Sequence, residues 1–261
     1  MDWKRSKRSI EIAFLFLVMA VLTLSCNKKT IRPDLPADER FAIAKKMFDK
    51  HNYFDAKDQF RIITLSNSGS AIADKAQYYL AECHFNLKEY ILSANEYERL
   101  IKIYPNSEYV DDAKYKLGLS YFQLSPKYSL DQEYTNKAIK EFQEFLEDYP
   151  SSPLVPVVEK KLLQARNKLA RKLYEAAEQY RKLGLYHSGV IYYTLVLEKY
   201  YDSSYAPQAQ YWLGECYRHL NQFDKALDSY KSFLKKYPQH SFAKRAESRI
   251  KEMTLRVKQK G

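Results

Sequence analysis

Residues 76–87 read AQYYLAECHFNL and residues 209–220 read AQYWLGECYRHL, so nearly the same phrase occurs twice, 133 residues apart. Related closing phrases occur at four places in the chain: IYPNSEYVDDA, DYPSSPLVPVV, KYYDSSYAPQA and KYPQHSFAKRA. Each puts an aromatic residue, and usually a proline, where an amphipathic helix must end. Self-similarity of this kind is typical of helical repeat architectures.

The stretch 207–240 fits the tetratricopeptide pattern, in which two antiparallel helices cross closely at small residues. Gly214 and Ala226 occupy the two small positions, and Pro238 ends the second helix. Residues equivalent to Gly214 recur at intervals of 37, at Ala44, Ala81, Gly118 and Ala177, with one longer step in the middle. We therefore predict an all-α tetratricopeptide-repeat superhelix of about five helix–turn–helix repeats.

Two departures from the period explain the separation of 133. Gly118 and Ala138 are 20 apart where Ala81 and Ser93 are 12 apart, so the third repeat carries an insertion of eight residues. The next first helix runs on for 14 further residues, very nearly four helical turns. Three periods, the insertion and the extension account for the whole distance. We predict an extended helix at about 156–183, between repeats three and four, about 42 Å long.

The first 25 residues have the composition of an export signal. Four basic residues precede an apolar run of 13, at positions 12–24, which is too short to span a bilayer and fits the core of a signal peptide. Ser25 then precedes Cys26, as at the lipidation site of bacterial lipoproteins. An ordinary secretory signal with an incidental cysteine is the alternative. We predict a signal peptide at 1–25 and lipidation of Cys26, which would attach the chain to a membrane.

The rest of the chain divides into three parts. Residues 26–36, with two prolines, form a tether from the lipid to the fold. Residues 37–155 hold repeats one to three, and residues 156–261 hold the long helix, repeats four and five and a closing helix with a charged outer face. Without the signal the net charge is +9, which suits acidic lipid or an acidic protein face. Because the chain is exported, we expect no nucleic-acid partner.

The sequence carries no pattern of catalytic or metal-binding residues. Its five histidines are scattered, and it has no HExxH motif, no Gly-rich phosphate loop and no GxSxG motif. Cys83 and Cys216 are equivalent letters of the repeated phrase, which indicates two buried core residues rather than a disulfide. We predict a protein that is not an enzyme and that holds no metal or cofactor. An enzyme that uses the repeats as a substrate platform is an alternative that no motif supports.

Aromatic residues recur at two positions that point into the concave groove of a tetratricopeptide superhelix. The position three before the small residue holds Phe41, Tyr78 and Tyr115, and the position four after it holds Phe48, Phe85 and Phe122. We call these six residues the aromatic ladder. The ladder either packs between neighbouring helices or accepts an extended or helical peptide that carries apolar and aromatic side chains.

The second half of the chain keeps only one of these positions aromatic. Tyr174 and Tyr211 occupy the first position, whereas Arg181 and Arg218 occupy the second. The two arginines would suit a partner with acidic groups. The groove positions lack the set of Asn and Lys residues that clamps a chain-terminal carboxylate.

Two segments resemble the BamD family of outer-membrane assembly lipoproteins. The first is the insertion with its helix, SLDQEYTNKAIKEFQEFLEDYPSS (129–152), and the second is KLARKLYEAAEQYRKLGLYHSGVIYYTLVLEKY (168–200). The match includes Asp131-Gln132, Thr135 and Tyr149-Pro150, and the resemblance extends over nearly all of the chain after the signal.

The resemblance implies a non-catalytic scaffold on the periplasmic side of the outer membrane, within the β-barrel assembly machinery. Repeats one to three, with the aromatic ladder, would receive the C-terminal signal of unfolded outer membrane β-barrel proteins. The last repeats, with Arg181 and Arg218, would contact a BamA-like barrel assembly subunit. The alternative is another exported tetratricopeptide lipoprotein, an adaptor for envelope growth or secretion.

Overall fold

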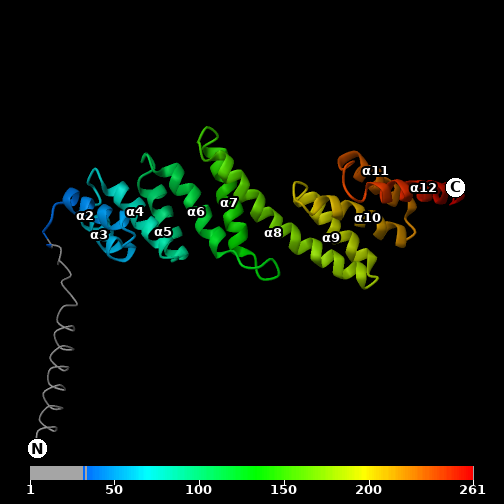
Figure 1. The fold of residues 1–261 in the computed structure, drawn as a ribbon, viewed down its shortest axis with the longest axis horizontal. Helices are drawn as coiled ribbons and strands as arrows, with labels where there is room; N and C mark the ends of the chain where they lie inside the picture. The colour runs from blue at the N-terminus through cyan, green and yellow to red at the C-terminus, as the bar shows by residue number, and fades with distance from the viewer. Residues whose placement is uncertain (1–31, 33, 261) are drawn as a thin grey trace, which may run out of the picture.

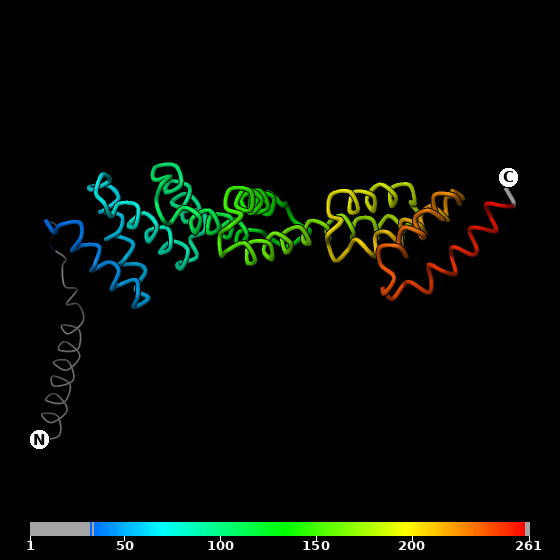
Figure 2. Tube along the Cα trace, turned by 90° about the horizontal axis from the view of Figure 1, so that it is seen from above, coloured from blue at the N-terminus to red at the C-terminus, as the bar shows by residue number. Residues whose placement is uncertain are grey.

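The computed structural model describes residues 32 and 34–260, which form helices joined by short turns (Figure 1). The helices are α2 (Ala37–Asp49), α3 (Tyr53–Ser66), α4 (Ala73–Asn86), α5 (Tyr90–Ile103), α6 (Val110–Leu124), α7 (Glu133–Asp148), α8 (Val155–Lys182), α9 (Tyr186–Lys199), α10 (Ala206–His219), α11 (Phe223–Lys236) and α12 (Ala243–Lys260). Consecutive helices pack in antiparallel pairs, and the pairs stack into an elongated molecule (Figures 1 and 2). The predicted tetratricopeptide superhelix of five repeats is confirmed, with α12 after the fifth.

A residue in the left-handed conformation reverses the chain between the helices of four repeats. His51, Lys88, Gly184 and Asn221 have φ between 57° and 75°, and each lies two residues beyond the end of a first helix. In the turn around His51, the amide of Asn52 donates to the carbonyl of Met47, and the other three turns repeat this hydrogen bond. Such a turn satisfies helix-end carbonyls that would otherwise have no partner.

Prolines follow the second helices, as the closing phrases predict. Pro105, Pro150 and Pro238 each lie two residues beyond the last helical residue, at the ends of α5, α7 and α11. A proline there cannot continue the helix, because it lacks the amide hydrogen and its ring clashes with the preceding turn. The chain then turns back to begin the next repeat.

The core is a continuous row of small and aromatic side chains between the helices of successive pairs. Ala44, Ala81 and Ala177 are fully buried at the small positions. Large rings fill the space beside them from the second helices, including Phe60, Tyr97, Phe142, Tyr193 and Tyr230. Each fully buried large apolar side chain stabilises the fold by about 1.5–3 kcal/mol.

Helix α8 is the element that joins the two ends of the molecule. It has 28 residues, against 14 in most of the others, and it crosses obliquely between α7 and α9 (Figures 1 and 2). Near its start, Val158 is buried against Phe142 and Phe145 of α7. Near its end, Ala177 packs against Tyr193 of α9. The long helix expected at 156–183 is therefore present, and it contributes to both halves.

The eight-residue insertion forms the α6–α7 loop, which lies against α8. Lys168 Nζ donates to the carbonyl of Ser125 (3.2 Å) and to its hydroxyl (2.6 Å), and Lys172 Nζ donates to the carbonyl of Leu130 (2.8 Å). Inside the loop, Gln132 Nε2 donates to the carbonyls of Lys127 (2.8 Å) and Leu130 (3.1 Å). The two departures from the 37-residue period thus meet at one joint, which comprises 125–132, the middle of α8 and the α9–α10 turn.

Some predictions concern residues that the structure does not describe. The signal peptide at 1–25 and lipidation of Cys26 lie outside the described residues, as does most of the tether at 26–36. At the start of the described chain, Arg40 of α2 donates to the carbonyl of Arg32 (3.0 Å). No helix from Ala37 to Lys260 combines the length and the apolar character needed to cross a membrane.

Candidate functional site

All six residues of the aromatic ladder are half-buried in the structure. They are carried by the first helices α2, α4 and α6 and recur with the period of the repeats. The ring contacts of these six residues are with aromatic residues outside the ladder. Each ring therefore packs on one side and leaves part of its surface exposed, and its role in peptide binding stays a prediction.

The ladder residues at the later position connect each first helix to the next first helix. Phe48 of α2 meets Tyr79 of α4 with ring centroids 5.2 Å apart. The ammonium group of Lys116 on α6 lies 5.1 Å from the ring centroid of Phe85 on α4. Lysines of α8 lie over Phe122 in the same way. A cation over an aromatic face is attracted by the ring quadrupole, so these contacts also tie neighbouring repeats together.

The ladder residues at the earlier position pack less uniformly. Tyr78 stacks on Tyr109, which lies directly before α6, with centroids 4.7 Å apart. Phe41 contacts Phe60 at 5.5 Å, and Tyr115 lies 6.4 Å from Phe142. Burial raises the pKa of Tyr78 and of Tyr115, so both phenols stay uncharged at neutral pH.

Tyr79 is an aromatic residue that contacts the ladder of the first repeat but does not occupy a ladder position. Its ring contacts Phe41 (5.9 Å), Phe48 (5.2 Å) and Phe60 (5.5 Å), and Lys45 Nζ lies 5.2 Å from its centroid. It therefore holds the rings of the first repeat in one cluster. The repeated phrases contain the signal that identifies it, because an aromatic residue occupies the same place in both, Tyr79 in YY and Trp212 in YW.

Arg181 and Arg218 are occupied by partners within the chain. Arg181 donates to both carboxylate oxygens of Glu178, at 3.0 and 2.9 Å, and its guanidinium lies 4.0 Å from the ring centroid of Trp212. Arg218 donates twice to Glu215 Oε2, at 3.2 and 3.0 Å. Their side chains are about one-fifth exposed, at 22% and 23%. These internal contacts fix the orientation of each guanidinium group, which stays partly accessible to a partner.

A glutamate and a tyrosine 15 residues later form a pair in three repeats, with Glu82 and Glu215 buried and Glu178 partly buried. Tyr97 donates to Glu82, Tyr193 to Glu178, and Tyr230 to Glu215. Each pair also has a cation, which is Lys116 for Glu82 (2.7 Å) and the two arginines for the others. The pairs join the first helix of a repeat to its second helix, because the tyrosine always comes from the second.

Glu178 and Glu215 stay ionised because hydrogen bonds and nearby arginines outweigh the effect of burial on their pKa. Burial raises the pKa of Glu215, but donors from Tyr230, Arg218 and Arg249 hold that pKa below its usual value. The pKa of Glu178 is lowered in the same way, against burial, by Arg181 and Tyr193. An ionised, fully paired carboxylate serves to fix helices, and a carboxylate in this state is a poor proton donor.

The two cysteines of the described chain are core residues, and the titratable groups there form no cluster that could hold a metal ion. Cys83 and Cys216 are free and fully buried, and burial raises the pKa of each thiol to about 12. A protonated, buried thiol is not reactive, so the two cysteines act as core residues, as predicted. No group of three or more His, Cys, Asp or Glu side chains in the described residues is placed to hold a metal ion.

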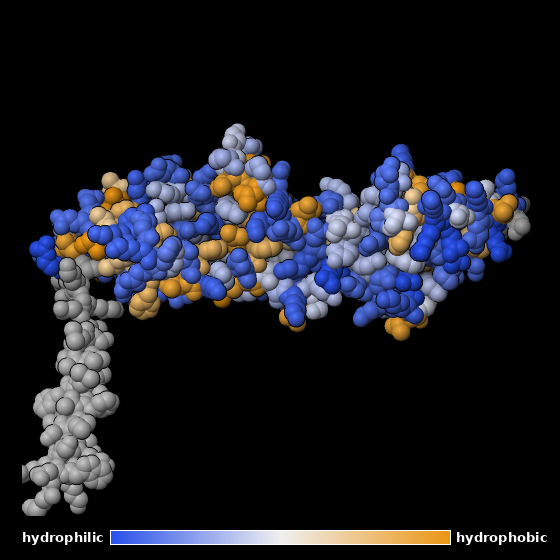
Figure 3. Space-filling view, in the orientation of Figure 1, coloured by the Kyte–Doolittle hydropathy of each residue, from blue (hydrophilic) through white to orange (hydrophobic). Residues whose placement is uncertain are grey.

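Hydrophobic surface is uneven along the molecule. On the face in Figure 3, hydrophobic residues gather mostly over the first half, from α2 to the start of α8, and hydrophilic residues dominate the second half. Exposed apolar side chains of the first half include Phe54, Leu65, Ile91, Leu92 and Ile103. The second half also exposes apolar side chains, among them Leu183, Ile191 and Tyr201, so the difference between the halves holds for the face in Figure 3.

Comparisons with known proteins agree with the tetratricopeptide fold. The family model named YfiO, described as outer membrane lipoprotein, matches residues 33–222, and a tetratricopeptide-repeat model matches 208–240. The outer membrane protein assembly factor BamD of Caulobacter vibrioides is 22% identical over 204 residues, which cover 76% of this chain and 67% of that protein. BamD of Helicobacter pylori is 25% identical over 178 residues, which cover 65% of this chain and 79% of that protein.

Solved structures with related architecture are more distant. The TPR2AB domain of yeast Sti1 in complex with pHSP90 has a TM-score of 0.44 and 15% identity, covering 85% of this chain and 84% of that one. The tetratricopeptide domain of P58(IPK) has a TM-score of 0.42 and 16% identity, covering 85% of this chain and 56% of that one.

Proposed function

Because the chain belongs to the YfiO family of outer membrane lipoproteins, we propose that it is a non-catalytic scaffold of the β-barrel assembly machinery. Both curated relatives above are named as outer membrane protein assembly factors. Anchored through a lipid on Cys26, the folded repeats would face the periplasm. There they help to recognise outer membrane β-barrel proteins and to insert them into the membrane.

Repeats one to three form the client-binding half of this scaffold. The observation that carries this assignment is the aromatic ladder, which repeats with the 37-residue period and whose six residues are all half-buried rather than sealed in the core. Aromatic side chains contribute much of the binding energy at protein interfaces. A client segment that ends in an aromatic residue meets such rings on three successive first helices.

Repeats four and five form the scaffold-binding half, which contacts a BamA-like barrel assembly subunit. Arg181 and Arg218 are held in fixed orientations by Glu178 and Glu215, and neither side chain is fully buried. A pre-oriented guanidinium loses little conformational freedom on binding a carboxylate. Acidic side chains of the partner subunit are therefore the expected contacts.

The client-binding role is tested with Phe85→Ala and Phe122→Ala in the whole chain. Loss of each ring is expected to weaken binding of a peptide that ends in an aromatic residue by about tenfold, because a buried aromatic contact at an interface contributes more than about 1 kcal/mol. Affinity is measured by fluorescence anisotropy, and circular dichroism verifies that the helical content is unchanged. Phe54→Ala is the matched control, since Phe54 is 59% exposed on α3, outside the ladder. Unchanged affinity with intact helicity would show that the ladder only packs helices together.

The scaffold-binding role is tested by crosslinking in native membranes from positions 78, 122, 181 and 218. We expect positions 181 and 218 to capture a large barrel protein with repeated periplasmic domains, and positions 78 and 122 to capture unfolded barrel proteins. Recovery of cell-wall enzymes or secretion components at these positions would instead identify an adaptor of another envelope process.

A further inference from the structure

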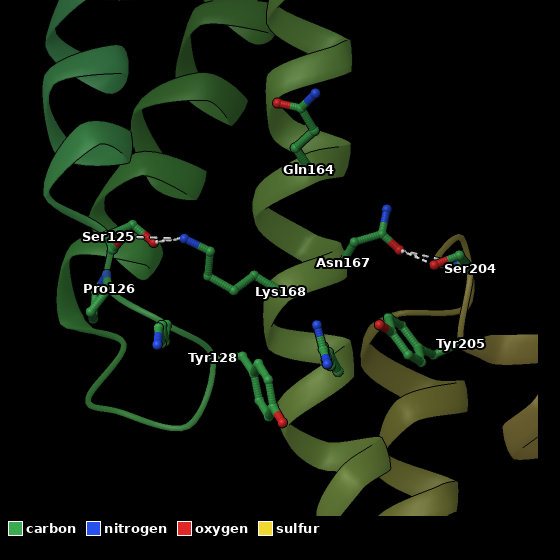
Figure 4. A pocket seen from close by; sticks show the side chains of 10 residues that line it. Ser125, Pro126, Tyr128, Gln164, Asn167, Lys168, Ser204 and Tyr205 are labelled. Atoms are coloured by element: carbon green, nitrogen blue, oxygen red, sulfur yellow. Dashed lines mark hydrogen bonds between the residues drawn. The ribbon is translucent and has the colours of Figure 1, made fainter.

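The joint forms an open cavity of about 840 Å³ at the surface (Figure 4). Three segments far apart in sequence line it. They are 125–128 of the insertion loop, the α8 residues Gln164, Asn167, Lys168 and Arg171, and the α9–α10 turn at Ser204 and Tyr205. The cavity exists because of both departures from the repeat period, since the loop supplies one wall and the extension of α8 supplies another.

The lining is rich in cations and contains no carboxylate. Lys127, Lys168 and Arg171 line the cavity, and none of the residues that line it is acidic. Lys168 bonds only to neutral oxygens of Ser125. Burial lowers the pKa of Lys168, and no nearby carboxylate counteracts this effect. Its ammonium group is thus partly desolvated without a compensating negative charge.

The cations around Lys168 are not neutralised inside the cavity either. The guanidinium of Arg171 lies 4.2 Å from the ring centroid of Tyr128, and its carboxylate contact is Glu175, at 3.5 Å on the exposed side of α8. Asp202 lies nearby, but both of its oxygens accept hydrogen bonds from Arg166 at 2.8 Å. The positive charge in the cavity therefore remains available to a ligand.

Asn167 adds hydrogen-bond donors to this charge. Its Oδ1 accepts from the amide (2.8 Å) and the hydroxyl (3.0 Å) of Ser204, as Figure 4 shows, which fixes the amide group. The Nδ2 hydrogens then point away from Ser204 and can donate to a ligand. Lys168 lies on one side of α8 beside Ser125 and Asn167 on the other beside Ser204, so donors line both ends of the cavity, and Lys168 and Arg171 supply the positive charge that an oxyanion needs.

We propose that this cavity is a binding site for a carboxylate group presented by a protein partner. The aromatic walls, Tyr128 and Tyr205, suit the chain that carries the carboxylate. The cavity also adjoins the last residue of the aromatic ladder, because Lys168 Nζ lies 5.5 Å from the ring centroid of Phe122. A polypeptide on the ladder can thus continue into the joint. The carboxylate comes either from the terminus of that polypeptide or from an acidic side chain.

Three synthetic peptides distinguish these sources. All are ten residues of alternating tyrosine and glutamine ending in phenylalanine. The first has a free C-terminal carboxylate, the second is C-terminally amidated, and the third is amidated with one glutamine replaced by glutamate. Binding to the whole chain is measured by fluorescence anisotropy. We expect the second peptide to bind about tenfold more weakly than the better of the other two, a factor that corresponds to about 1.4 kcal/mol. Which of those two binds better identifies the source.

The variant Lys168→Gln is expected to remove this difference of about tenfold, while Lys168→Arg retains it. Lys160→Gln is the matched control, because Lys160 is exposed on the same helix and does not line the cavity. Arg171→Gln provides a second test if Lys168→Gln reduces the helical content. Equal affinity for all three peptides, or an undiminished difference in Lys168→Gln and Arg171→Gln, overturns the proposal. Phe85→Ala weakens all three peptides alike, so failure of the ladder and failure of the cavity give different patterns.

Discussion

Gly118 and Gly214 lie where two helices cross, and each is required because a large ring of the second helix lies against it. A Cβ on Gly214 would lie 2.7 Å from Cε1 of Tyr230, and one on Gly118 would lie 2.7 Å from Cε1 of Phe142. Both rings are fully buried and fixed, so they have no room to move away. In repeats three and five the second helix thus approaches the first helix more closely than a methyl group permits.

We predict that Gly118→Ala and Gly214→Ala each lower the free energy of unfolding by about 1–3 kcal/mol through overpacking. This result runs against helix propensity, which favours alanine by about 1 kcal/mol. Urea denaturation followed by circular dichroism measures the change. Gly69→Ala is the control, because nothing lies within 4 Å of a Cβ at that position, and it should change stability by less than about 0.5 kcal/mol. An equal effect at all three positions would contradict the packing explanation.

The glutamate–tyrosine pair shows how two positions of a repeat depend on each other. Where the first helix lacks the glutamate, the second helix lacks the hydroxyl, since Lys45 occurs with Phe60 and Leu119 with Phe142. A buried hydroxyl without an acceptor costs free energy, and so does a buried carboxylate without donors. The two positions therefore differ together between repeats: a glutamate occurs with tyrosine, and another residue occurs with phenylalanine.

We predict that Tyr97→Phe lowers the free energy of unfolding by about 1–3 kcal/mol, because it leaves Glu82 buried with one donor fewer. The ring and its packing are retained, so the decrease in the free energy of unfolding measures the contribution of the hydroxyl alone. Tyr104→Phe is the matched control, since its hydroxyl donates to the carbonyl of Ser68 at the surface. Equal stability of the two variants in urea denaturation would show that the buried pair contributes nothing.

At the scale of the elements, the continuity of α8 fixes the two halves relative to each other. Its middle turns carry the buried residues Ala165, Leu169 and Ala170, and the insertion loop contacts these turns through Lys168 and Lys172. A change in the direction of this helix therefore moves everything from α9 to α12.

We predict that Leu163→Pro leaves both halves helical but broadens the distribution of distances between them. The proline removes the hydrogen bond to the carbonyl of Glu159 and clashes with that turn, which kinks the helix. Spin labels at Ser68→Cys and Lys235→Cys, both exposed, measure the distance by electron paramagnetic resonance. Leu163→Ala should keep the narrow distribution of the unsubstituted chain. A narrow distribution in the proline variant would mean that contacts outside α8 fix the halves.

The elements themselves were largely predictable from the sequence, because periodicity determines them. The interval of 37 between small residues located the five repeats, and the extension of 14 residues located a helix expected at 156–183 and found at Val155–Lys182. The closing helix expected after repeat five is found at Ala243–Lys260. Its last turns carry no terminating glycine or proline before Gly261.

Contacts between non-equivalent positions were not predictable, because a period relates only equivalent ones. The internal partners of Arg181 and Arg218 depend on how closely neighbouring helices approach. The same holds for the docking of the insertion loop on Lys168, since the loop has no counterpart in another repeat. Tyr79 and Trp212 were visible in the quoted phrases, but the contacts that their rings make follow from the packing of neighbouring helices.

At the scale of the whole molecule, the first half depends on a helix that the expected boundary assigns to the second half. The expected boundary at residues 155 and 156 falls at the start of α8, yet that part of α8 covers the core of the third repeat. Val158 is fully buried against Phe142 and Phe145. The first half is therefore complete only when it includes α8.

We predict that a fragment ending at Lys182 is more stable than one ending at Leu154. The shorter fragment exposes Phe142 and Phe145, and the loss of about 1.5–3 kcal/mol for each uncovered large side chain lowers the Tm by roughly 5–15 °C. Thermal melting by circular dichroism measures this difference, and size-exclusion chromatography detects the aggregation that an exposed apolar end causes. Equal melting temperatures would show that α8 is not part of the first folding unit.

The docking of the insertion loop on α8 has a consequence for how the chain can change during evolution or engineering. Deletion of the loop alone would remove the carbonyl acceptors of the ammonium groups of Lys168 and Lys172. Shortening of α8 alone would remove the two lysines that hold the loop. Length changes at the two places are therefore linked. The span from 125 to 205 can accordingly be transplanted as a single spacer into another array of helical repeats, whereas neither of its parts can be transplanted separately.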